Sequence, residues 1–118
     1  MKWVVSNTVV LNGGDAAILH GVRACLRRVD ADAEIVVYDS HPEEAARRHP
    51  SFAFRRLAHD AAGDRRRRHR LLAAAHLSRA GWPKIARRAC PDDLVPILEA
   101  YRGADVVVST GGTYLVDH

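Results

Sequence analysis

The sequence has few cysteines, few lysines and no long apolar run, and each scarcity excludes a class of protein. Its two cysteines, Cys25 and Cys90, form neither a CxxC pair nor a cysteine–histidine spacing typical of a metal site. No segment approaches the roughly 18 uninterrupted apolar residues of a membrane helix. The first residues are strand-like and lack the small-residue cleavage site of a signal peptide. We therefore expect a cytoplasmic protein with no metal, no cofactor and no membrane span.

Only two of the eighteen basic residues are lysines, and the other sixteen are arginines. This richness in arginine favours a GC-rich coding sequence over nucleic-acid binding as the source of the net charge of +4. The charge gathers in residues 65–70, where five arginines surround His69. Such a block can bind phosphates, but no aromatic residues are interleaved with it and no recognition module surrounds it. A solvent-facing block is favoured, and we expect no nucleic-acid partner.

What the chain does contain is the pattern of one folded α/β domain of 118 residues, with 47% apolar and 27% charged residues. Short apolar or β-branched runs predict strands at residues 2–6, 34–38, 52–57 and 105–109. Helical periods and end signals predict helices at 15–29, 41–48, 64–80 and 92–102, with a further turn at 85–89. Right-handed crossovers then give one Rossmann-like half of a doubly wound parallel sheet, with strand order 3-2-1-4.

For two of these helices the sequence also predicts how the first turn is capped. In helix 15–29, Asp15 is placed to cap the first turn. Its predicted apolar face includes Cys25, which we therefore expect to be a buried thiol, and is made by Ile18, Val22, Cys25, Leu26 and Val29. In helix 92–102, Asp92 is the predicted cap, and Pro96 falls near the first turn, where backbone N–H groups lack helical partners.

Two glycine turns follow predicted strands. Asn12-Gly13-Gly14-Asp15 opens the first helix, and Thr110-Gly111-Gly112-Thr113 follows the last strand. Because the carboxyl ends of parallel strands share one edge, both turns are expected at the edge where α/β folds bind ligands. This edge is the candidate site.

The first turn presents backbone N–H groups at a helix start, which favours anions. However, it is neither a GxGxxG motif nor a GxxxxGK motif followed by Ser or Thr, and the carboxylate of Asp15 opposes a bound phosphate. Asp39 ends the second strand, where dinucleotide enzymes place the acid that holds a ribose. Without the glycine pattern, a loop or capping role is favoured for Asp39.

Taken together, these residues resemble the polysaccharide pyruvyl transferase family. Members have an N-terminal Asn-x-Gly-Asp motif before a small, apolar helix start, which is similar to residues 12–19 of this chain. They also have an Ala-Asp pair, an apolar strand, a Gly-Gly turn and a downstream Asp, in the order found from Ala104 to Asp117. The resemblance covers both ends of the chain and leaves residues 42–91 matched only in general pattern.

The resemblance implies a two-domain, glycosyltransferase-B-like enzyme that transfers the pyruvyl group of phosphoenolpyruvate to a sugar of a polysaccharide precursor. This chain would be the N-terminal, acceptor-side domain, inactive alone because the donor would be bound by a second domain. Such a half would expose a strand edge and apolar surface, and we expect it to self-associate.

Ketal formation requires one proton to be delivered to the enol carbon and another to be removed from the attacking hydroxyl, so a carboxylate at the cleft edge can act as acid or base. Asp15 and Asp117 are the candidates for this role. For Asp15 a plain helix cap stays open, and for Asp117 an ion pair. The candidate substrate-binding residues are Asn12, Gly13, Gly14, Gly111, Gly112 and Thr113.

Two other functions stay open at this point. One is a glycosyltransferase of the same architecture that uses a nucleotide sugar. The other is a non-catalytic α/β module that binds a phosphorylated ligand at the glycine edge. Basic residues for phosphoenolpyruvate in a following half would favour the pyruvyl transferase, and a free-standing protein that ends at His118 would favour the binding module.

Overall fold

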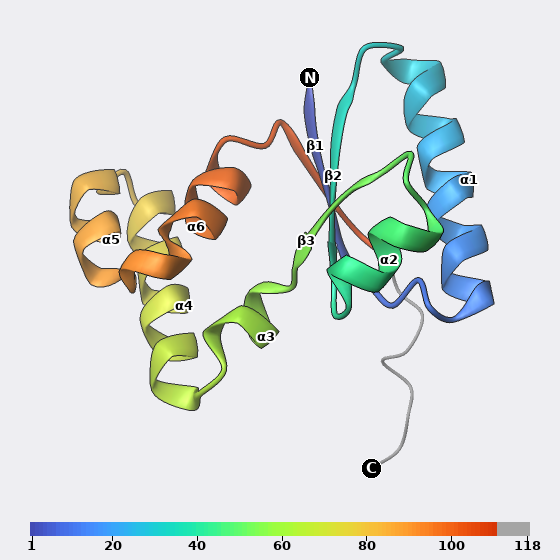
Figure 1. The fold of residues 1–118 in the computed structure, drawn as a ribbon. Coiled ribbons are helices and arrows are strands. Elements are labelled where there is room, and N and C mark those ends of the chain that lie inside the picture. The colour runs from blue at the N-terminus through green and yellow to red at the C-terminus, as the bar shows by residue number, and fades with distance from the viewer. Residues whose placement is uncertain (111–118) are drawn as a thin grey trace. The chain divides into compact units, whose positions relative to one another are not determined.

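A computed structural model of the chain describes residues 1–110 (Figure 1). They form two compact units. The first consists of Met1–Leu57 and the chain from Ala104 onward, and the second of Ala58–Gly103.

The first unit is built on a parallel sheet of four strands, β1 (Lys2–Thr8), β2 (Glu34–Asp39), β3 (Ala53–Arg56) and β4 (Val106–Ser109). Their order is β3-β2-β1-β4, which confirms both the predicted α/β class and the predicted 3-2-1-4 topology. The register places Trp3 beside Ile35 on one side and Val106 on the other. Strand β1 is therefore central, and β3 and β4 are the edges of this Rossmann-like sheet.

Helices α1 (Gly13–Val29) and α2 (Pro42–Arg48) cover one face of this sheet (Figure 1). The core on this face consists of apolar side chains from β1, β2, both helices and the adjoining loops, namely Trp3, Val5, Val10, Leu19, Leu26, Ala33, Val37, Ala45 and Phe52. In β1 the core residues alternate along the strand. The alternation follows from the strand period of two, which sends Trp3 and Val5 to the same face.

The apolar face predicted for α1 is not the face that is buried in the structure; the two differ by a rotation about the helix axis. Leu19 and Leu26 are buried, but Ile18 is 42% exposed, Val29 is 78% exposed and Cys25 is exposed. Residues 18, 25 and 29 form a stripe about 100° from that of residues 19 and 26, because each helical residue turns by that angle. The prediction of a buried Cys25 thiol was therefore wrong.

The second unit is helical. It contains α3 (Ala58–Ala62), α4 (Arg65–Arg79), α5 (Pro83–Ala89), a 3-10 turn η1 (Asp92–Leu94) and α6 (Val95–Arg102). Its core is made mostly of small side chains: Ala62, Ala74, Ala86, Cys90, Leu94 and Leu98. Burial raises the pKa of the Cys90 thiol, so this cysteine is the inert, packed one of the two.

Helix α4 begins and ends as the sequence predicts. The side chain of Asp64 accepts a hydrogen bond from Arg67 N at 2.9 Å, and the chain leaves the helix through Gly81, whose φ of 85° favours glycine. Helix α3 was not predicted, because five residues are too few to show a helical period.

The predicted helix over residues 92–102 starts later than expected, because Pro96 lacks the N–H that would bond to the carbonyl of Asp92. The N–H of Val95 takes that carbonyl instead, which makes the first turn a 3-10 turn. Helix α6 then begins at Val95 with Leu94 as its N-cap, so the prediction of an Asp92 cap was wrong.

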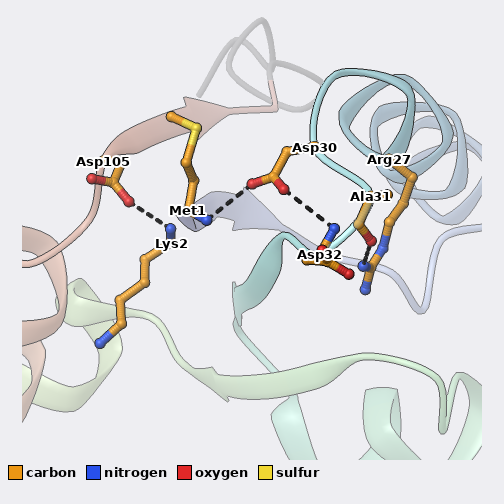
Figure 2. Close-up of polar contacts among 7 residues, drawn as sticks. All are labelled: Met1, Lys2, Arg27, Asp30, Ala31, Asp32 and Asp105. Carbon is orange, nitrogen blue, oxygen red and sulfur yellow. Dashed lines mark hydrogen bonds and ion pairs between the residues drawn. The ribbon is translucent and has the colours of Figure 1, made fainter.

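At the amino edge of the sheet, the chain start is held by two carboxylates (Figure 2). The Met1 ammonium lies 3.0 Å from Asp30 Oδ2, and Lys2 N donates to Asp105 Oδ2 at 2.7 Å. Asp30 Oδ1 also accepts from Asp32 N at 3.2 Å. These contacts join β1 to the loop before β2 and to the start of β4, at the end of the sheet opposite the candidate site.

None of the helices described in residues 1–110 has the length and apolar character needed to cross a bilayer.

Candidate functional site

The two motif-bearing segments leave the sheet at the same edge. Strands β1 and β4 are parallel neighbours, and Ser6 pairs with Ser109. Beyond that pair, Thr110 donates to Ser6 O twice, from its backbone N at 3.1 Å and from Oγ1 at 3.2 Å. The predicted convergence at the carboxyl edge is confirmed as far as Thr110. The predicted site residues Gly111, Gly112, Thr113 and Asp117 lie outside the described residues.

Asn12 caps helix α1. Its backbone is extended, with φ of −82° and ψ of 124°, and its Oδ1 accepts from Gly14 N at 3.4 Å. Asn12 N also donates to Val9 O at 3.0 Å, which closes the turn before the helix. The prediction that Asp15 is the cap was therefore wrong, because Asn12 already occupies that position.

Asp15 lies in the first turn of α1 and is partly buried. Its Oδ2 has no hydrogen-bond partner among the described residues, although that atom is shielded from solvent. A shielded carboxylate oxygen without a donor is costly, so this atom is ready to accept a hydrogen bond. The positive end of the α1 dipole stabilises the negative charge there.

Gly13 and Gly14 are open to approach. Neither has a positive φ, and a Cβ built on Gly13 would meet no atom within 4 Å. On Gly14 it would meet only Asn12 Oδ1, at 3.9 Å. The chain's own conformation and packing therefore do not require glycine at either position. Because Gly13 and Gly14 have no side chains, a ligand can reach the backbone at the start of α1.

Asp39 has hydrogen-bond partners that the sequence did not reveal. Its carboxylate is fully buried at the end of β2 and accepts three hydrogen bonds. Oδ2 accepts from Thr8 Oγ1 at 2.8 Å and from Val10 N at 2.9 Å, and Oδ1 accepts from His41 N at 2.7 Å. Asp39 thus fastens the loop between β1 and α1, which carries the Asn12 turn. Because the side chain is fully buried and both of its oxygens hold the protein's own groups, its role is structural, as the missing glycine pattern favoured.

A second cluster that linear spacing did not predict joins α1 to the segment after α2. His20 Nε2 lies 3.3 Å from His49 Nδ1, and both His20 and Arg23 contact the ring of Phe52. Arg23 also donates to Ser51 Oγ at 2.7 Å. The two histidines are 29 residues apart in the sequence, so no local sequence motif indicates the pair. Within residues 1–110 no group of three or more metal-ligating side chains is present.

The class defined by these observations is a Rossmann-like α/β protein with a glycine turn at the carboxyl edge of its parallel sheet. Comparison of the chain with protein-family models, with curated proteins and with solved structures finds no match.

Proposed function

We propose that this chain is the acceptor-side domain of a pyruvyl-transferase-like enzyme, which transfers pyruvyl from phosphoenolpyruvate to a sugar of a polysaccharide precursor. The observation that carries the proposal is the shared edge of β1 and β4. It brings the Asn12–Asp15 turn and the start of the second glycine segment to one side of the sheet. The donor would be bound by a second domain.

The polar groups of the first turn suit a neutral sugar better than a phosphate. The carboxylate of Asp15 and the side-chain amide of Asn12 can accept hydrogen bonds, and sugar hydroxyls donate them. The bare backbone at Gly13 and Gly14 lets a flat sugar ring approach closely. A phosphate at the same place would meet the negative charge of Asp15.

The reaction assigns Asp15 a chemical role. An acceptor hydroxyl adds to C2 of phosphoenolpyruvate while a proton adds to the methylene C3, which becomes a methyl group. A second hydroxyl of the sugar then displaces phosphate from C2 and closes the cyclic ketal. Each attacking hydroxyl loses a proton, and a carboxylate in the first turn of α1, at the edge of the sheet, is a suitable acceptor for it.

Ligand class is tested by NMR titration of the ¹⁵N-labelled chain with methyl glycosides of galactose, glucose and N-acetylhexosamines. ATP, NAD and UDP-glucose are the comparison ligands. We expect at least one glycoside to shift the Gly13 and Gly14 amides, and the nucleotides to bind no better than about millimolar, because the turn lacks a phosphate-loop lysine. Micromolar nucleotide binding mapped to these glycines would instead favour the nucleotide-sugar transferase or the phosphate-binding module.

Catalysis is tested in a protein that also contains a donor-binding domain, by following phosphate release from phosphoenolpyruvate in the presence of the acceptor. Asp15→Asn should lower kcat by roughly a hundredfold or more at a nearly unchanged melting temperature. Asp32→Asn is the matched control, because it makes the same change on an exposed residue near the opposite end of the sheet. Turnover near the wild-type value in Asp15→Asn would exclude the acid–base role.

A further inference from the structure

Helices α4 and α5 carry positive charge without any negative charge. Residues 65–89 contain nine basic side chains and no aspartate or glutamate. Three of the nine are occupied within the unit: Arg67 pairs with Asp93, and Arg68 and Arg70 donate to the carbonyls of Gly63 and Ala89. The other six are exposed and make no hydrogen bond or ion pair with the described residues: Arg65, Arg66, Arg79, Lys84, Arg87 and Arg88.

Helix α5 combines this charge with exposed apolar side chains. Ala86 and Cys90 fix its inner side in the core of the second unit. Lys84, Arg87 and Arg88 are all exposed on the helix.

Two large apolar residues lie beside these cations. Trp82 directly precedes α5 and is 57% exposed, and Ile85 is 47% exposed. Trp82 and Ile85 line one shallow hollow together with Lys84, so they form an adjacent apolar pair among cations and not scattered single residues.

The combination fits an anionic bilayer surface better than other anionic partners. Tryptophan prefers the headgroup region, where its ring is in an apolar layer and its N–H is in a polar one. Basic side chains next to it attract anionic lipids. A nucleic acid would use the cations but offers no apolar layer for Ile85.

We propose that the α4–α5 hairpin docks on an anionic lipid surface. Trp82 and Ile85 insert at headgroup level, and Lys84, Arg87 and Arg88 pair with lipid phosphates. Docking of this kind is peripheral, because α5 has only seven residues and lies at the interface without crossing it. The inference does not depend on the proposed transferase activity.

The two tryptophans make the test direct. Trp3 is 9% exposed in the core of the first unit, whereas Trp82 is exposed. A blue shift of the emission on adding vesicles therefore reports burial of Trp82. The chain is titrated with vesicles of phosphatidylcholine alone and of phosphatidylcholine with about one third phosphatidylglycerol, and bound protein is measured by co-sedimentation. We expect binding and a blue shift only with the anionic vesicles, weakening as salt is raised.

Charge variants test whether vesicle binding depends on this surface or only on the net charge of the protein. Arg87→Gln/Arg88→Gln should weaken vesicle binding by roughly thirtyfold, since each basic residue near an anionic surface contributes about a fivefold factor. Arg28→Gln/Arg55→Gln is the control, because it removes the same charge from exposed, unpaired arginines of the first unit. The control should bind vesicles like the wild type. Trp82→Ala should lose the blue shift and weaken binding, while Trp3 emission still reports a folded core.

Three outcomes would overturn the proposal. One is equal binding to neutral and anionic vesicles, or none to either. Another is equal weakening in the Arg28/Arg55 control, which would indicate net charge alone. The third is burial of Trp82 by something else, seen either as a concentration-dependent blue shift without vesicles or as tight binding to a DNA duplex without vesicle binding.

Discussion

Gly13 is the residue at which stability and ligand binding are expected to oppose each other. It occupies the first position of α1 with ordinary backbone angles and open space around its Cα. Alanine there should stabilise the fold by roughly 0.5–1 kcal/mol, because it restricts the unfolded chain without a clash. The added methyl group would stand where a ligand approaches. We predict that Gly13→Ala raises the urea midpoint and abolishes the glycoside-induced amide shifts.

Gly21→Ala is the matched control for this effect. Gly21 is exposed in the middle of the same helix, and a Cβ there also meets no atom within 4 Å. This variant should gain about as much stability, roughly 1 kcal/mol, and leave glycoside binding unchanged. Retained binding in Gly13→Ala would contradict the assignment of this backbone to the site.

Asp39 gives the second prediction at the residue scale. Asp39→Ala leaves the N–H groups of Val10 and His41 without their acceptor, and the Thr8 hydroxyl keeps only the carbonyl of Tyr38, at 3.0 Å. We expect a loss of about 3 kcal/mol in the free energy of unfolding, measured with urea. Thr8→Val removes only one donor of the three and should lose about 1 kcal/mol. Equal losses for both variants would show that the carboxylate does not hold the loop.

At the scale of elements, the ion pair between the Met1 ammonium and Asp30, which we call the N-terminal clamp, makes the attachment of β1 to the α1–β2 loop depend on pH (Figure 2). The hydrogen bond from the Met1 ammonium lowers the pKa of Asp30 below its ordinary value of 3.8, and the same bond raises the pKa of the amine above 8.0. The Asp30 contribution is present above its unfolded pKa and is lost as the pH falls through the lower folded pKa. The amine contribution is present below its unfolded pKa and is lost as the pH rises through the higher folded pKa.

The melting temperatures of wild type and Asp30→Asn should therefore differ most near neutral pH and converge in both acid and alkali. Acetylation of the Met1 amine should produce the same loss, because it removes the cation. Asp60→Asn is the control, because Asp60 is exposed in the second unit. The difference in melting temperature between this variant and wild type should not show a maximum near neutral pH. A constant gap between wild type and Asp30→Asn from acid to alkali would contradict the clamp.

Elements with strong local signals could be predicted, and those that depend on tertiary contacts could not. The runs Val4-Val5, Val36-Val37 and Val106-Val107 mark strands by β-branching, and the crossover rule then orders them. The side of α1 that is buried could not be predicted, because apolar residues occupy both the 18–25–29 and the 19–26 stripes. The contacts of Asp39 with Thr8 and Val10 and the His20–His49 pair join residues about 30 apart, so no local pattern contains them.

At the scale of the whole molecule, strand edges make self-association the expected behaviour. Strands β3 and β4 each have one unpaired side in the described sheet, and Val107 on β4 is 48% exposed. Free edges of this kind pair with other chains. Light scattering should show a mass that rises between micromolar and millimolar protein. A clean monomer throughout that range would contradict the expectation.

The two cores predict unequal local stability. The buried core of the first unit includes the large side chains of Trp3, Leu19, Leu26 and Phe52, whereas the fully buried core of the second has no aromatic residue, and half of it is alanine. Since hydrophobic stabilisation follows the apolar area buried, the second unit has less to oppose the entropy of its backbone. We therefore expect amides of α4, α5 and α6 to exchange with deuterium faster than those of β1 and β2.

Leu98→Ala tests this difference in local stability, because Leu98 is buried in the second core and not in the first. Truncation should cost about 2–4 kcal/mol locally. It should remove most protection from residues 65–102, while the amides of Val4, Val5 and Val37 in the central strands keep theirs. Loss of protection in β1 and β2 by the same factor would mean that the two cores unfold as one cooperative unit, and the expected difference between them would then be wrong.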